Sequence, residues 1–474
     1  MRIGIVASEG VPFSKTGGLA DVSGSLFKEF AKLGHKTYFF LPYYRNTKGV
    51  FDDFDDSYEF SIKIGEKILS GCALIKEYYK DARVVLIQQD EYFDRRSLYG
   101  EAGIDYADNG ERFGFFSKAI PYIISGMKLN IEVLHLNDWQ TGLIPIFLKD
   151  HNLDIKTYFT IHNLAYQGNF DPIILRELSI DYDYFNIDGL EFYGKVSFIK
   201  AGIVYSDMIG TVSPSYASEI KTEKFGENLH GILKTKGNSL HGILNGVDYD
   251  VWNPVSDSYI YQRYSISEIE RKEVNKMKLV KELGLLDAKV PLFGIVGRVA
   301  SQKGFDILTE ALTDFLRENV NFVILGTGDK QLELSLEALS KLYPDKFKLI
   351  LGFSEELAHK IYASSDYFVM PSKYEPCGLG QLIALRYGTL PVVHAVGGLK
   401  DTVDNYNEYT NCGNGFSFEE YSSYELYKSL SKAKEFFFSK DKFTRTQINA
   451  MNCDFSWNNS ALKYIKLFEE LIQK

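Results

Sequence analysis

A strand, a glycine-containing loop and a helix follow one another twice along this chain, and that pattern limits its possible folds most narrowly. In the first copy, residues 3–7 form a continuous apolar run and residues 15–21 contain a glycine pair. Apolar side chains then recur at helical spacing over 19–33, and residues 37–41 form a second apolar run. Because parallel strands need a crossover connection, usually a helix, this order predicts a βαβ unit and a parallel sheet.

The second copy begins near Pro291. An apolar run at 292–296 predicts a strand, residues 297–304 a loop, and residues 305–316 a helix. Further apolar runs predict strands at 84–87, 133–136, 156–161, 208–212, 242–244, 321–325, 348–351, 367–370 and 390–394. The predicted fold class is therefore α/β, with two Rossmann-like parallel-sheet domains in series.

The two copies suggest domain boundaries. We expect an N-terminal domain over 1–250, a C-terminal domain over 251–455, and a final helix over 456–474 that begins after a Ser456 N-cap. A charged stretch with apolar periodicity, residues 265–285, predicts one helix leading into the second domain. A cleft facing the carboxyl ends of both sheets is the expected ligand site.

Composition excludes several classes of function. The 474 residues carry a net charge of −10, which argues against non-specific nucleic-acid binding. A bound phosphate would need a local cluster of cations and backbone N–H groups. No apolar run approaches the ~20 residues of a membrane span, and the N-terminus resembles a strand rather than a signal peptide. Four cysteines without CxxC or metal-ligand spacing fit a reducing cytosol, so we expect a cytoplasmic protein without a membrane partner.

Two loops have the chemistry to bind phosphate. Lys15, Gly17 and Gly18 lie between the first strand and the first helix, where backbone N–H groups and a helix N-terminus favour an anion. Arg298 and Lys303 flank the loop after the first strand of the second copy. Charge-assisted hydrogen bonds from two cations suit a diphosphate.

Two further groups follow predicted strands. Glu375 lies between a strand and a helix, where a carboxylate can accept hydrogen bonds from sugar hydroxyls and stabilise positive charge at an anomeric carbon. Cys377 could be a nucleophile, but no His lies nearby in sequence, so packing is the favoured role. His135, Asp138 and His162 favour polar contacts or acid–base help, and a metal site stays an alternative without supporting spacing.

A nicotinamide enzyme is disfavoured. Neither glycine loop has the GxGxxG fingerprint, and neither second strand ends in the acidic residue that would bind ribose.

Many short motifs occur in one order along the whole chain. They are KTGGLAD at 15–21, HLNDWQ at 135–140, TIHNLAYQG at 160–168, TVSP at 211–214, LNGVD at 244–248, GR at 297–298 with QKG at 302–304, GTGD at 326–329, EPCGL at 375–379, YGTLP at 387–391 and DFSW at 454–457. In this order they resemble the bacterial glycogen synthase and plant starch synthase family, glycosyltransferase family 5.

The resemblance implies a GT-B fold, in which two Rossmann-like domains face each other across a cleft and the C-terminal helix crosses back to the N-terminal domain. It implies retaining transfer of glucose from ADP-glucose to the non-reducing end of an α-1,4-glucan such as glycogen. It implies no cofactor and no obligatory metal. UDP-glucose, another acceptor, or a catalytically silent glucan-binding protein are the alternatives.

The resemblance also implies roles for single residues. The expected catalytic residues are His162, Arg298, Lys303 and Glu375. The expected donor-binding residues are Lys15, Gly17, Gly18, Asn245, Arg298, Lys303, Phe353, Cys377, Gly378 and Leu379, with Phe353 against the nucleobase. Asp138 is expected on the acceptor side. Three positions, Asn228, Gly380 and His394, depart from the family's usual residues and bear on donor choice and acceptor geometry.

Overall fold

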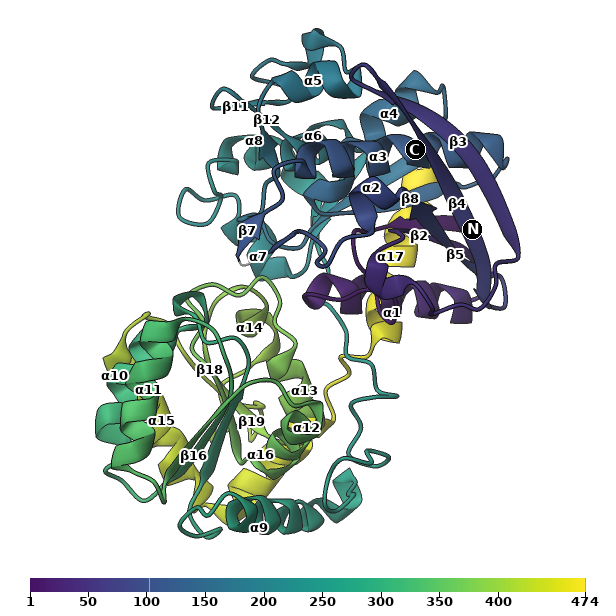
Figure 1. Cartoon of the computed structure of the whole chain (residues 1–474). Helices are drawn as coiled ribbons and strands as arrows, with labels where there is room; N and C mark the ends of the chain where they lie inside the picture. The colour runs from purple at the N-terminus through teal and green to yellow at the C-terminus, as the bar shows by residue number, and fades with distance from the viewer. Residues whose placement is uncertain (102, 474) are drawn as a thin grey trace. The chain divides into compact units, whose positions relative to one another are not determined.

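The computed structural model describes residues 1–101 and 103–473, which divide into two compact units (Figure 1). Unit 1 comprises Met1–Val212, Ala217–Ile243 and the C-terminal segment from Ser460. Unit 2 comprises Ser213–Tyr216 and Leu244–Asn459. Each unit has its own mainly parallel sheet, so the α/β prediction with two parallel-sheet domains is confirmed.

The main sheet of unit 1 has nine strands in the order β14-β13-β9-β8-β1-β2-β5-β4-β3. Its strands are β1 (Arg2–Val6), β2 (Lys36–Pro42), β3 (Asp56–Ile64), β4 (Lys67–Tyr79), β5 (Ala82–Gln88), β8 (Val133–Asn137), β9 (Lys156–Ile161), β13 (Met208–Thr211) and β14 (Leu240–Gly242). The strands from β14 to β5 are parallel, and β4 and β3 add an antiparallel extension. β1 lies between β2 and β8, which explains its continuous apolar sequence.

The helices of unit 1 include a long first helix that follows the first glycine loop. They are α1 (Gly18–Lys32), α2 (Asp90–Phe93), α3 (Asn109–Gly126), α4 (Ile144–Asp150), α5 (Ile173–Leu178), α6 (Phe198–Tyr205) and α8 (His230–Thr235). Short strands β10 (Asn169–Phe170), β11 (Glu191–Phe192) and β12 (Lys195–Ser197) form a small separate sheet, and β6 (Gly100–Glu101) pairs with β7 (Ile104–Asp105). Helices α7 (Pro214–Glu219) and α17 (Trp457–Ile472) contain residues of both units.

The last helix, α17, returns to the N-terminal sheet. Phe468 is fully buried, and its ring contacts Phe30 of α1, His135 of β8 and Tyr158 of β9. Tyr464, one turn earlier, contacts the same three side chains. Residues four apart lie on one face of a helix, so a single stripe of α17 completes the core of unit 1.

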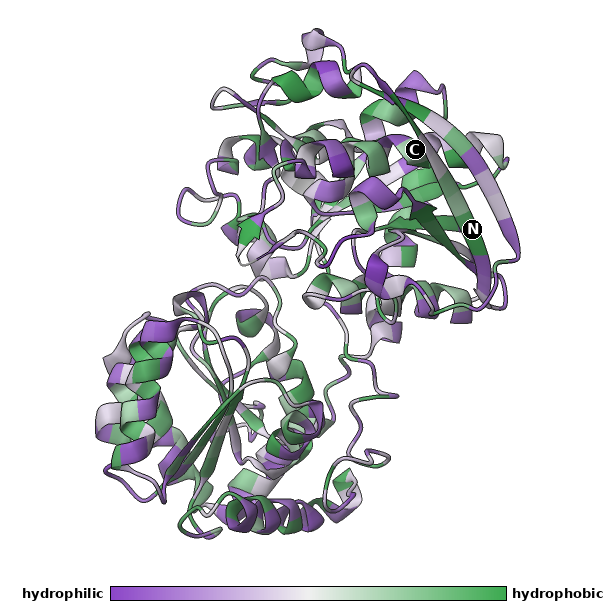
Figure 2. Ribbon diagram, in the orientation of Figure 1, coloured by the Kyte–Doolittle hydropathy of each residue, from purple (hydrophilic) through white to green (hydrophobic). Residues whose placement is uncertain are grey.

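Unit 2 has a six-stranded, fully parallel sheet in the order β17-β16-β15-β18-β19-β20. Its strands are β15 (Leu292–Val296), β16 (Asn321–Gly326), β17 (Phe347–Leu351), β18 (Tyr367–Met370), β19 (Leu390–His394) and β20 (Phe416–Phe418). Its helices are α9 (Lys272–Glu282), α10 (Phe305–Phe315), α11 (Lys330–Leu342), α12 (Glu355–Ser364), α13 (Gly380–Arg386), α14 (Gly397–Thr402), α15 (Ser423–Phe437) and α16 (Lys440–Met451). The strands are its most hydrophobic part (Figure 2), and a buried cluster joins them to α10 and α15.

Three local predictions differ from the structure. The strand expected at 242–244 lies at Leu240–Gly242. Ile243 is already outside the strand and keeps one backbone hydrogen bond, from its N–H to the Thr211 carbonyl. The single helix expected over 265–285 is a 3-10 helix at Ile266–Arg271 followed by α9, with non-helical backbone at Glu268. Strands β3 and β4 were not predicted, because they alternate buried and exposed residues instead of forming the continuous apolar runs that marked the other strands.

Two features of the described residues concern the environment of the chain. None of their helices has the length and apolar character needed to cross a membrane. All four cysteines lie in the described part, and none forms a disulfide.

The packing of α17 leads to a stability prediction. Replacing Phe468 by alanine should lower the free energy of unfolding of unit 1 by about 3–5 kcal/mol, because it removes a buried ring and leaves a cavity. Leu462→Ala is the control, since this side chain of the same helix is 50% exposed and should change stability by less than about 0.5 kcal/mol. Chemical denaturation measures both, and equal losses would show that α17 does not complete this core.

Candidate functional site

Most of the predicted site residues follow the carboxyl ends of parallel strands in each unit. In unit 1 they follow β1, β8 and β9, which are neighbours in the sheet. In unit 2 they follow β15, β17 and β18, and β15 lies between β16 and β18. The carboxyl ends of parallel strands share one edge of the sheet, so each unit gathers its own group of polar side chains there.

The glycine loop of unit 1 is exposed and leads directly into α1. Gly17 is the N-cap residue and Gly18 the first residue of the helix. Because Gly17 has no side chain, it makes no side-chain capping hydrogen bond. The Lys15 ammonium lies 2.7 Å from a carboxylate oxygen of Asp21 in the first turn of α1. Two N–H groups of the loop, those of Thr16 and Gly17, donate to the buried carboxylate of Glu9. Sequence reasoning missed Glu9, because no motif spacing marks it.

His162 follows β9, and its ring is oriented by the side-chain amide of Asn137, at the end of the neighbouring strand β8. Its Nε2 lies 2.9 Å from Oδ1 of Asn137, whose amide nitrogen donates to the carbonyl groups of Val6 and His135. Because that amide oxygen is an acceptor, the assignment puts the proton on Nε2 and leaves Nδ1 as an acceptor. Desolvation by burial lowers the pKa of His162 to about 3, so the ring is neutral at pH 7.

Asp138 follows β8 and is buried with a positive φ of 56°. Its carboxylate accepts a hydrogen bond from the backbone N–H of His162 at 2.7 Å, which ties the ends of β8 and β9 together. Desolvation by burial raises the pKa of Asp138 to about 7, although backbone hydrogen bonds from His162 and Asn163 act in the opposite direction. The carboxyl group therefore changes charge near neutral pH.

His135 has a different environment from its two motif partners. It is fully buried, its Nε2 lies 2.8 Å from the Thr160 hydroxyl, and its ring packs against Tyr464 and Phe468. His135 is thus part of the core of unit 1. The described residues contain no group of three His, Cys, Asp or Glu side chains that could hold a metal ion.

In unit 2, a close backbone approach brings two of the predicted site residues together. Gly304 has a φ of 79°, and a Cβ atom there would lie 2.0 Å from the carbonyl oxygen of Pro371. The backbone N–H of Lys373 also donates to the Gln302 carbonyl at 2.9 Å. The loops after β15 and β18 are therefore joined, and only glycine fits between them.

The result is an ion pair between Lys303 and Glu375. Nζ of Lys303 lies 2.6 Å from Oε2 of Glu375, with the carboxylate buried and the lysine partly exposed. The hydroxyl of Ser372 donates to the same oxygen at 3.0 Å. The Glu375 carbonyl accepts from the N–H of Gly398 at 3.1 Å. Contacts at both the carboxylate and the backbone carbonyl thus hold Glu375 in one orientation.

Arg298 lies on the same loop and is exposed. Its Nη2 is 3.4 Å from the Gln302 amide oxygen, and no carboxylate of the described residues pairs with it. Most N–H donors of its guanidinium are therefore available to a ligand.

The loop that contains Glu375 continues through Cys377, Gly378 and Leu379 into α13. The Cys377 sulfur accepts the backbone N–H of Asn245 at 3.4 Å, so two predicted donor residues are in contact. Gly378 has a φ of 77°, which favours glycine. Desolvation by burial raises the pKa of the Cys377 thiol to about 12, so the nucleophile alternative is contradicted by a protonated, buried thiol.

Phe353 lies two residues after the end of β17. Its ring is 87% exposed, immediately before Ser354, the N-cap of α12. An apolar ring that open to solvent at a strand's carboxyl end is available to a flat ligand.

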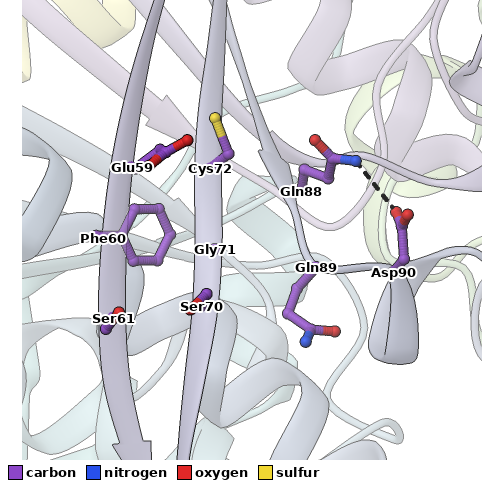
Figure 3. A pocket seen from close by; sticks show the side chains of 9 residues that line it. All are labelled: Glu59, Phe60, Ser61, Ser70, Gly71, Cys72, Gln88, Gln89 and Asp90. Atoms are coloured by element: carbon purple, nitrogen blue, oxygen red, sulfur yellow. Dashed lines mark hydrogen bonds between the residues drawn. The ribbon is translucent and has the colours of Figure 1, made fainter.

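A cavity elsewhere in unit 1 contains none of the predicted site residues. It has a volume of about 620 Å³ and lies over the antiparallel extension of the sheet, with Glu59, Cys72, Gln88 and Asp90 in its lining (Figure 3). Glu59, Cys72 and Gln88 form one cross-strand row on β3, β4 and β5.

Comparison with known proteins identifies the family. Residues 2–235 match the family described as starch synthase catalytic domain, and residues 280–436 match glycosyl transferases group 1. The glycogen synthase of Clostridium perfringens is 45% identical over 482 residues, covering 100% of this chain and 99% of its own. That of Koribacter versatilis is 43% identical over 493 residues with the same coverage. The chain belongs to the glycogen synthase and starch synthase family.

Solved structures agree with this assignment. The catalytic domain of starch synthase IV from Arabidopsis thaliana, bound to ADP and acarbose, superposes with a TM-score of 0.89 at 30% identity and covers 100% of this chain and 99% of that one. A sucrose-phosphate synthase from Thermosynechococcus elongatus, at 17% identity and a TM-score of 0.63, shares the fold. The predicted GT-B fold is confirmed, and the chain is a glycosyltransferase of the glycogen synthase type.

The environment of Cys377 leads to a labelling prediction. At pH 8 a thiol with a pKa near 12 is ionised in only about one molecule in 10⁴, and thiolate is the reactive species. Iodoacetamide should therefore modify the exposed Cys412 at least ~100-fold faster than Cys377 in the folded protein. Mass spectrometry of the labelled peptides measures both rates, and both cysteines should react at similar rates in denaturant. Similar rates in the folded protein would contradict the burial of Cys377.

The raised pKa of Asp138 leads to a prediction about stability and pH. The folded protein keeps this proton up to about pH 7, whereas the unfolded chain loses it near pH 4. The folded state therefore binds more protons between these values, so the contribution of Asp138 to stability falls as pH rises through that window. The stability of the wild type relative to Asp138→Asn should fall by up to ~4 kcal/mol from pH 4 to pH 7. Urea denaturation at several pH values measures the difference, and a constant difference would exclude the raised pKa.

Proposed function

We propose that this chain transfers glucose from ADP-glucose to the non-reducing end of an α-1,4-glucan such as glycogen, with retention of the α-configuration. The observation that carries the proposal is the Lys303–Glu375 ion pair beside the unpaired Arg298 at one sheet edge. Full-length relatives named glycogen synthase support the reaction. The ADP and acarbose bound by the Arabidopsis starch synthase support the nucleotide and the glucan.

Arg298 and Lys303 hold the diphosphate in this proposal. Breaking the glycosidic bond to a nucleoside diphosphate leaves growing negative charge on the leaving phosphate oxygens. A guanidinium and an ammonium at fixed positions stabilise that charge more in the transition state than in the ground state, which is the condition for faster chemistry. These cations do the work that a metal ion does in other phosphate chemistry, so the proposal requires no metal and no further cofactor.

Glu375 acts beside the donor glucose. As the bond to the diphosphate breaks, positive charge develops on the sugar ring, and a nearby carboxylate stabilises it. The ion pair with Lys303 couples the two charges: when the ammonium turns toward the diphosphate, the Glu375 carboxylate loses its partner and its negative charge is available to the sugar. The Ser372 hydroxyl keeps it oriented during that change.

The remaining donor residues of unit 2 bind parts of the donor that do not react. The exposed ring of Phe353 stacks on the nucleobase. Gly378 and Leu379 follow Glu375 and present backbone groups to the donor. Asn245 and the buried Cys377 hold this loop through their mutual hydrogen bond, which makes Cys377 a structural member of the donor site.

Unit 1 contributes the second set of residues. Lys15 provides a cation and Gly18 the first N–H group of α1 for a phosphate, with Gly17 as the N-cap that precedes the helix. The neutral His162 ring accepts a hydrogen bond from a sugar hydroxyl at its Nδ1 atom. Asp138, at the neighbouring strand end, contacts the acceptor. We propose a cytoplasmic location, because four unpaired cysteines fit a reducing compartment.

UDP-glucose is the second candidate donor, and one observation bears on it. A Cβ atom at Gly380 would lie 2.8 Å from the Phe368 ring and 3.2 Å from the Met370 sulfur. These two side chains fill the space of a larger residue, so the donor loop lacks a hydroxyl at this position. Competition between the two nucleotide sugars in one assay separates the candidates.

Transfer of radiolabelled glucose from ADP-glucose to glycogen tests the proposal with purified protein. Arg298→Ala and Lys303→Ala should each lower turnover by at least ~10²-fold, because each removes charge stabilisation in the transition state. Arg317→Ala is the control, since this exposed arginine of unit 2 pairs only with Asp314 on the surface, and it should keep wild-type turnover.

Each other outcome has a defined meaning. Turnover within a few-fold of the wild type in either cation variant would show that the diphosphate binds elsewhere. Glycogen binding without any incorporated label, equal in the wild type and in Glu375→Ala, would identify a catalytically silent glucan-binding protein.

A further inference from the structure

Glu9 is a buried carboxylate that none of the roles above uses. It lies three residues beyond β1, at the edge of the unit 1 sheet where Asp138 and His162 lie. Its side chain is only 4% exposed. Carboxylates are almost never buried to this extent unless hydrogen bonds or charges compensate the loss of water.

Four donor groups compensate for the burial of the Glu9 carboxylate, and three of them belong to the glycine loop. Oε2 accepts the backbone N–H groups of Thr16 at 2.5 Å and Gly17 at 3.1 Å. The Thr16 hydroxyl donates to Oε1 at 3.0 Å, and the Tyr99 hydroxyl donates to the same oxygen at 3.0 Å. The Glu9 backbone is fixed as well, because its carbonyl accepts the Ser23 hydroxyl of α1 at 2.7 Å.

These contacts substitute for a helix cap. A helix begins with N–H groups that have no partner within the helix, and a side chain at the N-cap usually satisfies one of them. The N-cap of α1 is a glycine without a side chain. Glu9 instead reaches across from the end of β1 and holds the two residues that precede the helix.

The same contacts determine which N–H groups a ligand can use. Those of Thr16 and Gly17 point to Glu9 and are not available to a phosphate. The N–H groups of Gly18 and Leu19, in the first turn of α1, lie beyond this hold and have no intrahelical acceptor. The loop is thus divided at Gly17 into a part that is held and a part that is free to bind.

We propose that Glu9 is a positioning residue for the nucleotide sugar. By holding Thr16 and Gly17 it fixes the glycine loop, so that the N–H groups of Gly18 and Leu19 and the ammonium of Lys15 meet the donor phosphates in one geometry. It does not touch the substrate. This inference rests on the proposed function, because it assumes that the glycine loop binds the donor.

Glu9→Gln tests the proposal in the full-length protein. Glutamine keeps the shape but removes the negative charge that the two loop N–H groups share at Oε2. Its NH2 group also replaces Oε1, the acceptor of the Thr16 and Tyr99 hydroxyls, by a donor. Thr16→Val is a milder variant that removes one hydroxyl donor and keeps the backbone. Glu29→Gln is the matched control: Glu29 is also a buried carboxylate of unit 1, on α1, and it pairs with Lys32 rather than with the loop.

Two measurements separate positioning from general stability. Amide hydrogen exchange of the peptide spanning 14–19 should become at least ~10-fold faster in Glu9→Gln and unchanged in Glu29→Gln. The Kd for ADP by calorimetry and the KM for ADP-glucose should rise about tenfold in Glu9→Gln and about threefold in Thr16→Val, as expected for lost charge-assisted hydrogen bonds. The KM for glycogen should stay at the wild-type value.

The outcomes distinguish this inference from the proposed function. Unchanged exchange at 14–19 in Glu9→Gln, or equal rises of both KM values, would overturn the positioning role even if the wild type binds ADP. A wild type that binds no ADP would overturn the proposed function and the donor-positioning role with it. In that case, faster exchange in Glu9→Gln would show that Glu9 stabilises the loop without a role in donor binding.

Discussion

The ion pair between Lys303 and Glu375 is the interaction on which the proposed chemistry of unit 2 depends. It exists because the loops after β15 and β18 meet at Gly304, where any side chain would collide with Pro371. In the proposed reaction, the pair keeps the two opposite charges together until a diphosphate competes for the Lys303 ammonium. Arg298 is exposed on the same loop, and in the proposal its guanidinium binds the incoming ligand.

In unit 1, burial and hydrogen bonds determine the charge of the polar groups at the sheet edge. Burial pushes the pKa of Asp138 upward and that of His162 downward, so near neutral pH a carboxyl group close to its midpoint lies beside a neutral imidazole. The backbone N–H of His162 links the two. Glu9 extends this arrangement to the glycine loop, and its hydrogen bonds make a flexible glycine segment a defined one.

Much of the fold was predictable from local patterns. Strands buried on both faces, such as β15, β18 and β19, have continuous apolar runs, and their predicted bounds match the structure. β3 and β4 were missed because one face of each is exposed to solvent, so their apolar residues alternate with polar ones and form no continuous run. In the site, Lys303 and Glu375 were predicted from their loops and lie together. Glu9, Asn137 and Ser372 were missed, because they act on the neighbours of motif residues and have no motif of their own.

The amino-acid sequence by itself determined the two parallel-sheet domains, the position of each polar loop at a strand end, and the family of the chain, since apolar periodicity and ordered motifs are local properties of the chain. Only the tertiary structure decided which of those polar groups meet and which charge each carries. His135 became a core residue and Cys377 a protonated structural thiol, whereas Glu9 became the anchor of the glycine loop. Burial and hydrogen bonding between residues far apart in sequence set these outcomes, and no local pattern records them.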